Sequence, residues 1–279
     1  MTKPRLDEVG YWTEVKLAIL REYSQAYTRI LSKQPELRHI YVDGCAGSGT
    51  HISKATGELI KGSPRIALKL EPKFSHYHFI DLDGQRTQEL KRLARGRQDV
   101  SVYTGDCNLV LVEEVFPKCR YEDYRRALCL LDPYGLNLRW DVVEAAGKMK
   151  SIEIFLTFMI MDANMNVLWR DPGKVPSSQI VRMNAFWGDD TWKQAVYAAE
   201  QDMFGPVERK GPNEALMEAY RRRLQERAGF KFAPPPMAMR NRKGAVIYYL
   251  FFASHNETGD RIARSVFRKY RDKGMVHGR

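Results

Sequence analysis

The sequence predicts a doubly wound α/β fold, in which a mostly parallel sheet is completed by an antiparallel C-terminal hairpin and interrupted by a mainly helical insertion. One observation is that short β-rich runs alternate with helical segments up to residue 158, as in βαβ units around a parallel sheet. A second is that these runs are apolar, as in strands covered by helices on both faces. A third is that each run ends in a Gly or Asp cluster, and open α/β sheets bind ligands at the carboxyl ends of their strands.

Regular elements are predicted along the first half of the chain. Apolar residues recur at helical spacing over residues 13–31, and Thr13 can cap the start of this leading helix. Strands are predicted at residues 39–43, 76–80, 100–104, 126–131 and 152–158. Helices are predicted between them at residues 85–95 and 141–149.

The alternation stops after residue 158. Residues 160–235 are mostly helical in pattern, with three tryptophans and several basic clusters. A hairpin is predicted from residues 237–240 and 245–253 around a turn, and a basic helix begins near Glu257. We therefore predict a core of residues 1–159 and 236–279, and an insertion, residues 160–235, that is a candidate for substrate recognition.

Composition narrows the class of protein. The 279 residues carry 45 Lys and Arg against 34 Asp and Glu, a net charge of +11 that favours a polyanionic partner, although a basic protein without one fits the charge equally well. The four cysteines and six histidines lack the spacing of disulfide or metal sites, so no metal is predicted. No signal peptide or membrane-length apolar run is seen, which predicts a cytoplasmic protein outside the membrane.

The first motif, Asp43-Gly-Cys-Ala-Gly-Ser-Gly49, follows the first predicted strand. Its glycines let the backbone turn tightly and approach a ligand, but their spacing fits neither a Walker A loop nor a G-x-G-x-x-G turn. The acidic residue ahead of them suits a cation, so a ligand with an ammonium and a carboxylate fits, such as the methionyl part of S-adenosylmethionine. A purely structural turn is the alternative. The cofactor-binding residues predicted here are Asp43, Gly44, Ala46, Gly47 and Gly49.

The second motif, residues 79–83, and the third motif, residues 105–108, place acidic residues where the second and third strands end. The Asp81 carboxylate can accept hydrogen bonds from both hydroxyls of a ribose, while Asp83 is predicted to cap the next helix. Asp106, followed by Cys107, can accept a hydrogen bond from an adenine amino group, or can simply cap a helix. We place Asp81, Asp106 and Cys107 in the cofactor site.

The fourth motif supplies the candidate catalytic residues Asp132, Pro133 and Tyr134. Asp132 would lie at the mouth of the cleft, where it can hold an exocyclic amine and help to carry its proton away. Tyr134 can stack against a planar group. The alternative is an ordinary Pro-Tyr-Gly turn.

Four such motifs in this order resemble the organisation of class I S-adenosylmethionine-dependent methyltransferases. The chain more specifically resembles the three-Cys-motif partner family, TcmP. The resembling segments are residues 14–23, 41–49, 62–68, 79–83, 105–108, 130–143 and 246–254. The resemblance implies a methyltransferase-like fold, S-adenosylmethionine as cofactor, and association with a separate three-cysteine protein.

The fourth motif also resembles the Asp/Asn/Ser-Pro-Pro-aromatic signature of amino methyltransferases that act on nucleic-acid bases. Asp132 and Pro133 match it, whereas Tyr134 stands in place of the second proline and Gly135 in place of the aromatic residue. Three hypotheses follow: a methyltransferase acting on DNA or RNA, a methyltransferase-like module that binds a partner protein or nucleic acid without catalysis, and a small-molecule methyltransferase. The third predicts no salt-dependent affinity for nucleic acid.

Basic and aromatic residues could supply a nucleic-acid surface. Arginines and lysines are frequent in the insertion, around the hairpin turn and along the last helix. Tryptophans could stack a base, although tryptophans at such spacing are more often part of a core. The three in the insertion are Trp169, Trp187 and Trp192, and the pair Trp169-Arg170 is the one predicted nearest the cleft.

Overall fold

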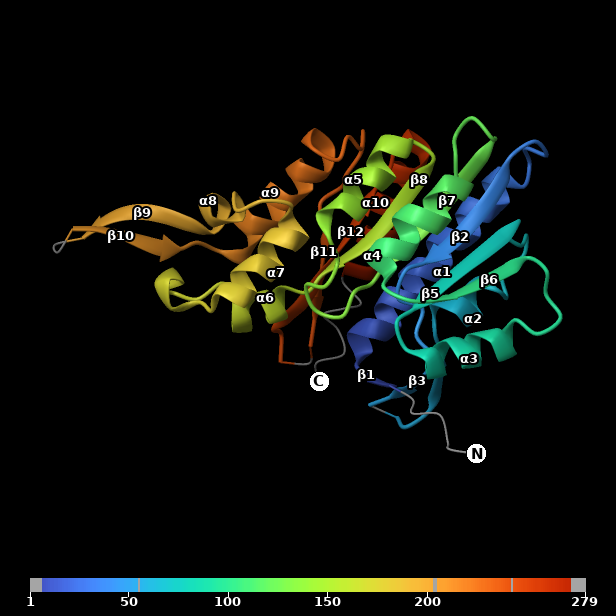
Figure 1. Ribbon diagram of the computed structural model, residues 1–279, viewed down its shortest axis with the longest axis horizontal. Helices are drawn as coiled ribbons and strands as arrows, with labels where there is room; N and C mark the ends of the chain where they lie inside the picture. The colour runs from blue at the N-terminus through green and yellow to red at the C-terminus, as the bar shows by residue number, and fades with distance from the viewer. Residues whose placement is uncertain (1–6, 55, 203–204, 242, 272–279) are drawn as a thin grey trace.

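The computed structural model describes residues 7–54, 56–202, 205–241 and 243–271, with the backbone alone for residues 198–208 (Figure 1). A seven-stranded sheet in the order β11-β12-β8-β7-β2-β5-β6 runs through its centre. The strands are β2 (Arg38–Asp43), β5 (His76–Asp81), β6 (Val100–Thr104), β7 (Arg125–Leu131), β8 (Ile152–Phe158), β11 (Met237–Arg240) and β12 (Val246–Ala253). All five predicted parallel strands are present.

Pairing in the sheet confirms the predicted topology. β6, β5, β2, β7 and β8 pair in parallel, while β12 is antiparallel to β8 and β11 is antiparallel to β12. The strand order reverses at β2, which lies between β5 and β7. Ligands of doubly wound folds bind outside the carboxyl ends of the strands at such a reversal.

Helices cover both faces of the sheet because its strands are apolar on both sides. Ile40 and Val42 of β2 belong to one buried cluster, and Tyr41 between them belongs to the other. One face carries α1 (Tyr11–Leu31), α2 (Ser63–Ala67), α3 (Gly84–Leu93) and α10 (Glu257–Arg271). The other carries α4 (Cys107–Val110), a π-helical turn (Leu111–Val115), a 3₁₀ turn (Phe116–Lys118) and α5 (Trp140–Met149). Within the described residues, no helix combines the length and apolarity needed to cross a membrane.

The insertion is mainly helical, as predicted. It contains α6 (Ile160–Asn166), a 3₁₀ turn (Pro172–Lys174), α7 (Ser177–Trp187), α8 (Trp192–Val196) and α9 (Asn213–Glu226). Tyr220 of α9 is fully buried, and its ring meets Phe158 of β8, Phe186 of α7 and Phe251 of β12. The aromatic cluster therefore continues from the sheet into the insertion, while the division of the chain into two domains stays a prediction.

Two small sheets were not predicted. An antiparallel ribbon of β9 (Tyr197–Asp202) and β10 (Gly205–Lys210) projects away from the central sheet, at the left of Figure 1. The expectation for residues 160–235 was only that they are mostly helical, and this ribbon is the part of them in which strand pairing fixes the backbone. A second sheet joins β1 (Asp7–Val9), β3 (Thr50–Ser53) and β4 (Leu59–Lys61) beside the start of α1.

Candidate active site

The four motifs meet at the carboxyl edge of the sheet. The first motif contacts the second and third: the Gly47 N–H donates to Asp81 at 2.8 Å, and the Cys45 and Cys107 sulfurs are 3.9 Å apart. The Gly44 N–H donates to the main-chain oxygen of Leu130, which precedes the fourth motif, at 2.9 Å. The predicted gathering of these motifs at one edge is therefore present in the structure.

Asp43, at the end of β2, is completely buried. Its Oδ2 accepts a hydrogen bond from the Tyr41 hydroxyl at 3.3 Å, whereas no described residue forms a hydrogen bond with Oδ1. Burial raises the pKa of this carboxyl to about 7, although the nearby Ser63 hydroxyl and Cys45 N–H pull it down. A buried acceptor without a donor is costly, so an ammonium or another donor at this position would be stabilised.

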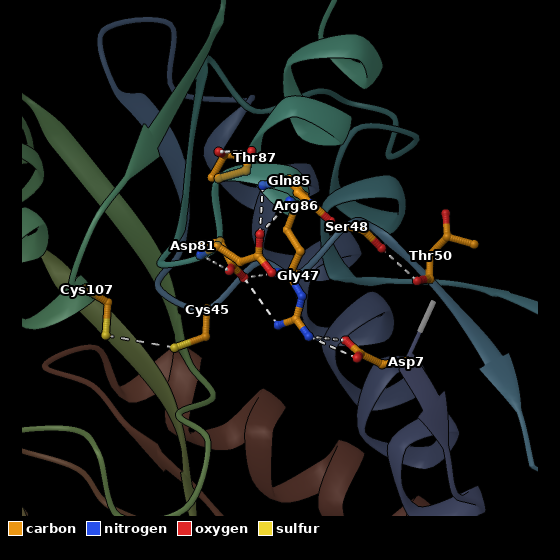
Figure 2. A network of polar contacts seen from close by, with 12 residues as sticks. Asp7, Cys45, Gly47, Ser48, Thr50, Asp81, Gln85, Arg86, Thr87 and Cys107 are labelled. Atoms are coloured by element: carbon orange, nitrogen blue, oxygen red, sulfur yellow. Dashed lines mark hydrogen bonds and ion pairs between the residues drawn. The ribbon is translucent and has the colours of Figure 1, made fainter. Parts of the chain in front are cut away.

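Asp81, at the end of β5, holds the glycine loop (Figure 2). Its Oδ1 accepts from the Asp83 N–H at 2.9 Å, and its Oδ2 accepts from Gly47, whose φ of +64° favours glycine. The Arg86 guanidinium lies 3.9 Å from the same carboxylate. Each carboxylate oxygen keeps a second lone pair, so these bonds leave capacity for a ribose hydroxyl. Asp83 caps α3 as predicted.

Asp106 in the third motif caps α4, which was one of its two predicted roles. Its Oδ1 accepts from both the main-chain and the side-chain nitrogen of Asn108 at 2.9 Å. The side chain is exposed, and its other oxygen has no hydrogen bond within the described residues, so capping and a contact with adenine are compatible. Beside it, a hydrogen bond from Cys45 lowers the pKa of the Cys107 thiol.

Asp132 does not stand free at the mouth of the cleft. The Lys16 ammonium of α1 forms an ion pair with its Oδ2, and the Thr157 hydroxyl donates to its Oδ1 at 2.8 Å. The Lys16 side chain is only 8% exposed and its ammonium lies 5.5 Å from the centre of the Tyr248 ring. Sequence reasoning missed Lys16, although its spacing from the apolar residues Ile19, Leu20 and Tyr23 places it on the buried face of the helix.

Tyr134 is 93% exposed, so it lines no closed pocket here, whereas Pro133 is buried. The loop that carries both is fixed by Asp162 of α6, which accepts from the Leu136 N–H at 3.1 Å. A Cβ on Gly135 would lie 2.8 Å from that carboxylate, and its φ is +64°. The aromatic residue is therefore displaced by one position because the close approach of Asp162 requires glycine there.

Asp162 itself was not predicted as part of this region. It lies 3.0 Å from the Arg182 guanidinium of α7 and so ties the fourth motif to the insertion. A second residue that sequence reasoning passed over is His51 of β3. Its Cε1 would be 3.8 Å from a Cβ on Gly47, its Nδ1 has no hydrogen-bond partner over residues 7–54, 56–202, 205–241 and 243–271, and burial lowers its pKa. A neutral imidazole beside the glycine loop is a further possible ligand contact.

The tryptophans divide by burial. Trp187 and Trp192 are 3% and 2% exposed, so they belong to the core and the expectation that they could stack a base was wrong. Trp169 is 36% exposed, with its indole N–H donated to the Met165 main-chain oxygen at 2.8 Å. Trp169 therefore remains the one candidate of the three for an aromatic contact. Over the residues that the structure describes, no three His, Cys, Asp or Glu side chains converge as a metal site would require.

Comparisons with known proteins bear on the fold. No protein-family model and no curated protein matches the sequence. The crystal structure of LPL1258 from Legionella pneumophila, assigned to the family model DUF519, has a TM-score of 0.54 at 10% identity and covers 91% of this chain and 90% of its own. A putative methyltransferase from Thermobifida fusca has a TM-score of 0.42 at 11% identity, covering 85% of this chain and 80% of its own.

The likeness to LPL1258 shows a shared fold alone, because identity is so low. The sheet has the strand order β11-β12-β8-β7-β2-β5-β6, with β12 antiparallel to β8. The chain therefore has a Rossmann-like class I methyltransferase fold, as predicted. Membership of the TcmP family stays a prediction.

Proposed function

We propose that the protein is an S-adenosylmethionine-dependent methyltransferase that acts on a DNA or RNA base. The observation that carries the proposal is the buried, unpartnered Oδ1 of Asp43 directly before the glycine loop. A cofactor with a cationic methionyl group supplies the donor that this atom lacks. S-adenosylmethionine, when bound, contributes a methyl group on a positively charged sulfur, which is already a good donor.

The residues at the carboxyl edge of the sheet fit the methionyl, ribose and adenine groups of that cofactor. Asp43 would accept from the methionyl ammonium, and the turn at Gly47 would bring main-chain N–H groups toward the carboxylate. Asp81 would accept from the ribose hydroxyls with the lone pairs that Gly47 and Asp83 leave. Asp106 and Cys107 would border the adenine. The protein's main contribution to rate would be in-line placement of the acceptor in a site that excludes water.

Asp132 is the residue proposed to orient the acceptor amine and take up its proton. Lys16 neutralises it in the structure, so the amine would have to compete with the ammonium for the carboxylate. Tyr134 is exposed beside it and could stack on a base that has left its strand. The net charge of +11 and the exposed Trp169 and Arg170 support a nucleic-acid substrate.

Calorimetric titration with S-adenosylmethionine and its demethylated product tests the cofactor. We expect micromolar binding, at least about tenfold weaker binding for Asp43→Ala, and binding within about threefold of wild type for Asp132→Ala. Asp83→Ala is the matched control, because it removes a carboxylate that caps α3 but is not assigned to the cofactor. Equal affinity for all four proteins would contradict the assignment of Asp43.

Methyl transfer is then screened with labelled cofactor on DNA and RNA. Asp132→Ala should abolish transfer although it still binds the cofactor. Unchanged turnover in that variant would remove Asp132 from the mechanism. Transfer only to small molecules, with no salt-dependent affinity for nucleic acid, would exclude the proposed substrate class.

A second candidate function is a binding module without catalysis, and the Lys16–Asp132 ion pair favours it. Such a module would bind nucleic acid, or a three-cysteine partner protein, with an affinity indifferent to the cofactor. Fluorescence anisotropy with labelled DNA and RNA, with and without the cofactor, separates the two functions. A folded protein that binds nucleic acid but neither binds S-adenosylmethionine nor transfers a methyl group would be this module.

A further inference from the structure

A cavity of about 510 Å³ lies at the opposite edge of the sheet from Asp43 and Asp132. It is bounded by the second half of α1, the amino ends of β7 and β8, and the start of α10. None of the motif residues assigned to the proposed active site lines it. Its volume falls in the range of about 300–1,000 Å³ that is typical of small-molecule sites.

The inner wall of the cavity carries a buried, hydrogen-bonded carboxyl group and a tyrosine hydroxyl. The Glu153 carboxyl accepts from the Tyr23 hydroxyl at 2.5 Å and from the Ser254 hydroxyl at 2.9 Å. The neighbouring Tyr27 is 7% exposed, and its hydroxyl has no hydrogen-bond partner in the part of the chain that the structure describes. A buried hydroxyl in a cavity wall is costly unless a ligand or a water completes its hydrogen bond.

Cations surround the outer part of the same cavity. Arg126 lies with its guanidinium 3.6 Å from the centre of the Tyr121 ring, and Lys150 and Lys231 are exposed at the edge. No carboxylate pairs with any of these three among the described residues, and Glu257 is the one exposed carboxylate that lines the cavity. The lining thus carries cations at its outer part and a buried carboxyl at its inner wall, with tyrosine and aliphatic side chains between them.

We propose that this cavity binds a nucleoside monophosphate. The phosphate would meet Arg126, Lys150 and Lys231, because unpaired cations favour a dianion and guanidinium pairs well with phosphate. The base would lie between the tyrosine and leucine side chains, with a polar edge at the Tyr27 hydroxyl. The hydroxyls of Tyr23 and Ser254 are already bonded to Glu153, so the inner wall offers the phosphate no cation and the phosphate would stay at the outer part.

Calorimetry with GMP tests the proposal, because an adenine nucleotide could also enter the proposed cofactor site. We expect GMP to bind, and guanosine and inorganic phosphate to bind more weakly, since each carries half of the recognised groups. Arg126→Ala should weaken GMP binding by about tenfold or more, and Tyr27→Phe by about threefold to tenfold. Higher ionic strength should weaken binding as well.

Two matched variants keep the test specific. Lys148→Ala removes a lysine of α5 that pairs with Glu144 and does not line the cavity, so it should leave GMP affinity unchanged. Asp43→Ala should also leave it unchanged, which separates this cavity from the proposed cofactor site. No binding of GMP by the folded wild-type protein would overturn the proposal. So would binding that is lost in Asp43→Ala, or that Arg126→Ala and Tyr27→Phe both retain in full.

Discussion

Two buried carboxyl groups occupy opposite edges of the same sheet, Asp43 at the carboxyl end of β2 and Glu153 near the amino end of β8. They are 0% and 8% exposed, and burial raises the pKa of each to about 7. Both oxygens of Glu153 accept hydrogen bonds from hydroxyls, whereas Oδ1 of Asp43 accepts none from the residues that the structure describes. Burial and a raised pKa are therefore common to both groups. The difference is that Asp43 has an oxygen that can still accept a hydrogen bond from a ligand, whereas both oxygens of Glu153 are already bonded.

The largest expected effect is on the pH dependence of stability at Asp43. Between about pH 4 and pH 7 the native carboxyl keeps a proton that the unfolded carboxyl has lost, so the free energy of unfolding falls as pH rises through that window. A shift from 3.8 to about 7 corresponds to about 4 kcal/mol. Asp43→Asn should remove this part of the decline and leave the part that the raised pKa of Glu153 contributes, as measured by urea denaturation from about pH 5 to about pH 8. Parallel pH profiles for the two proteins would show that Asp43 ionises normally.

The second effect is the cost of removing the satisfied group. Glu153→Ala takes the acceptor from two buried hydroxyls, those of Tyr23 and Ser254, and should lower the free energy of unfolding by about 3 kcal/mol near pH 6. Glu153→Gln is the control, because its amide keeps an acceptor and nearly the same volume. Asp43→Ala at the same pH should cost less than Glu153→Ala. The reverse order would mean that Asp43 is better satisfied than its contacts indicate.

The features that the sequence could predict are those set by local pattern. Asp43 and Asp81 are the last residues of their strands and Asp132 directly follows its strand, so local pattern and the geometry of parallel sheets were enough to bring them to one edge. The capping role of Asp83 was likewise local. The antiparallel closing strands were predicted from a turn signal and a long apolar run.

The features that the sequence could not predict depend on contacts between segments far apart in the chain. Lys16 reaches Asp132 from a helix 116 residues earlier in the chain, and Asp162 reaches the fourth motif from the insertion. The second cavity is assembled from four separate elements with no shared motif, so no local pattern marks it. The β9–β10 ribbon was missed because its residues have no strong β preference.

A third prediction concerns the ion pair at the active edge. Lys16→Met keeps most of the buried aliphatic stem but leaves the carboxylate of Asp132, 28% exposed, with the Thr157 hydroxyl as its remaining partner. The expected loss is about 2 kcal/mol, less than for a fully buried pair because water reaches Asp132. Adding Asp132→Asn to Lys16→Met should restore part of it, and the double-mutant cycle gives the coupling energy. Lys33→Met, at an exposed lysine just after α1, is the control and should change nothing. A coupling near zero would mean that the ammonium contributes no net stability at this site.

The smallest expected effect is on the reactivity of the cysteine thiols. Cys107 and Cys45 are half-buried at the candidate cofactor site, whereas Cys119 and Cys129 are buried and burial raises their pKa values. The hydrogen bond from Cys45 lowers the pKa of Cys107, so iodoacetamide should modify Cys107 first near neutral pH. Cys45→Ala removes that hydrogen bond and should slow the reaction severalfold, which peptide mass spectrometry over a time course measures. The demethylated cofactor product should protect Cys107 if it binds against the third motif. Rapid modification that the product does not slow would place the bound cofactor away from Cys107, and the adenine contact would then have to come from another side chain at this edge.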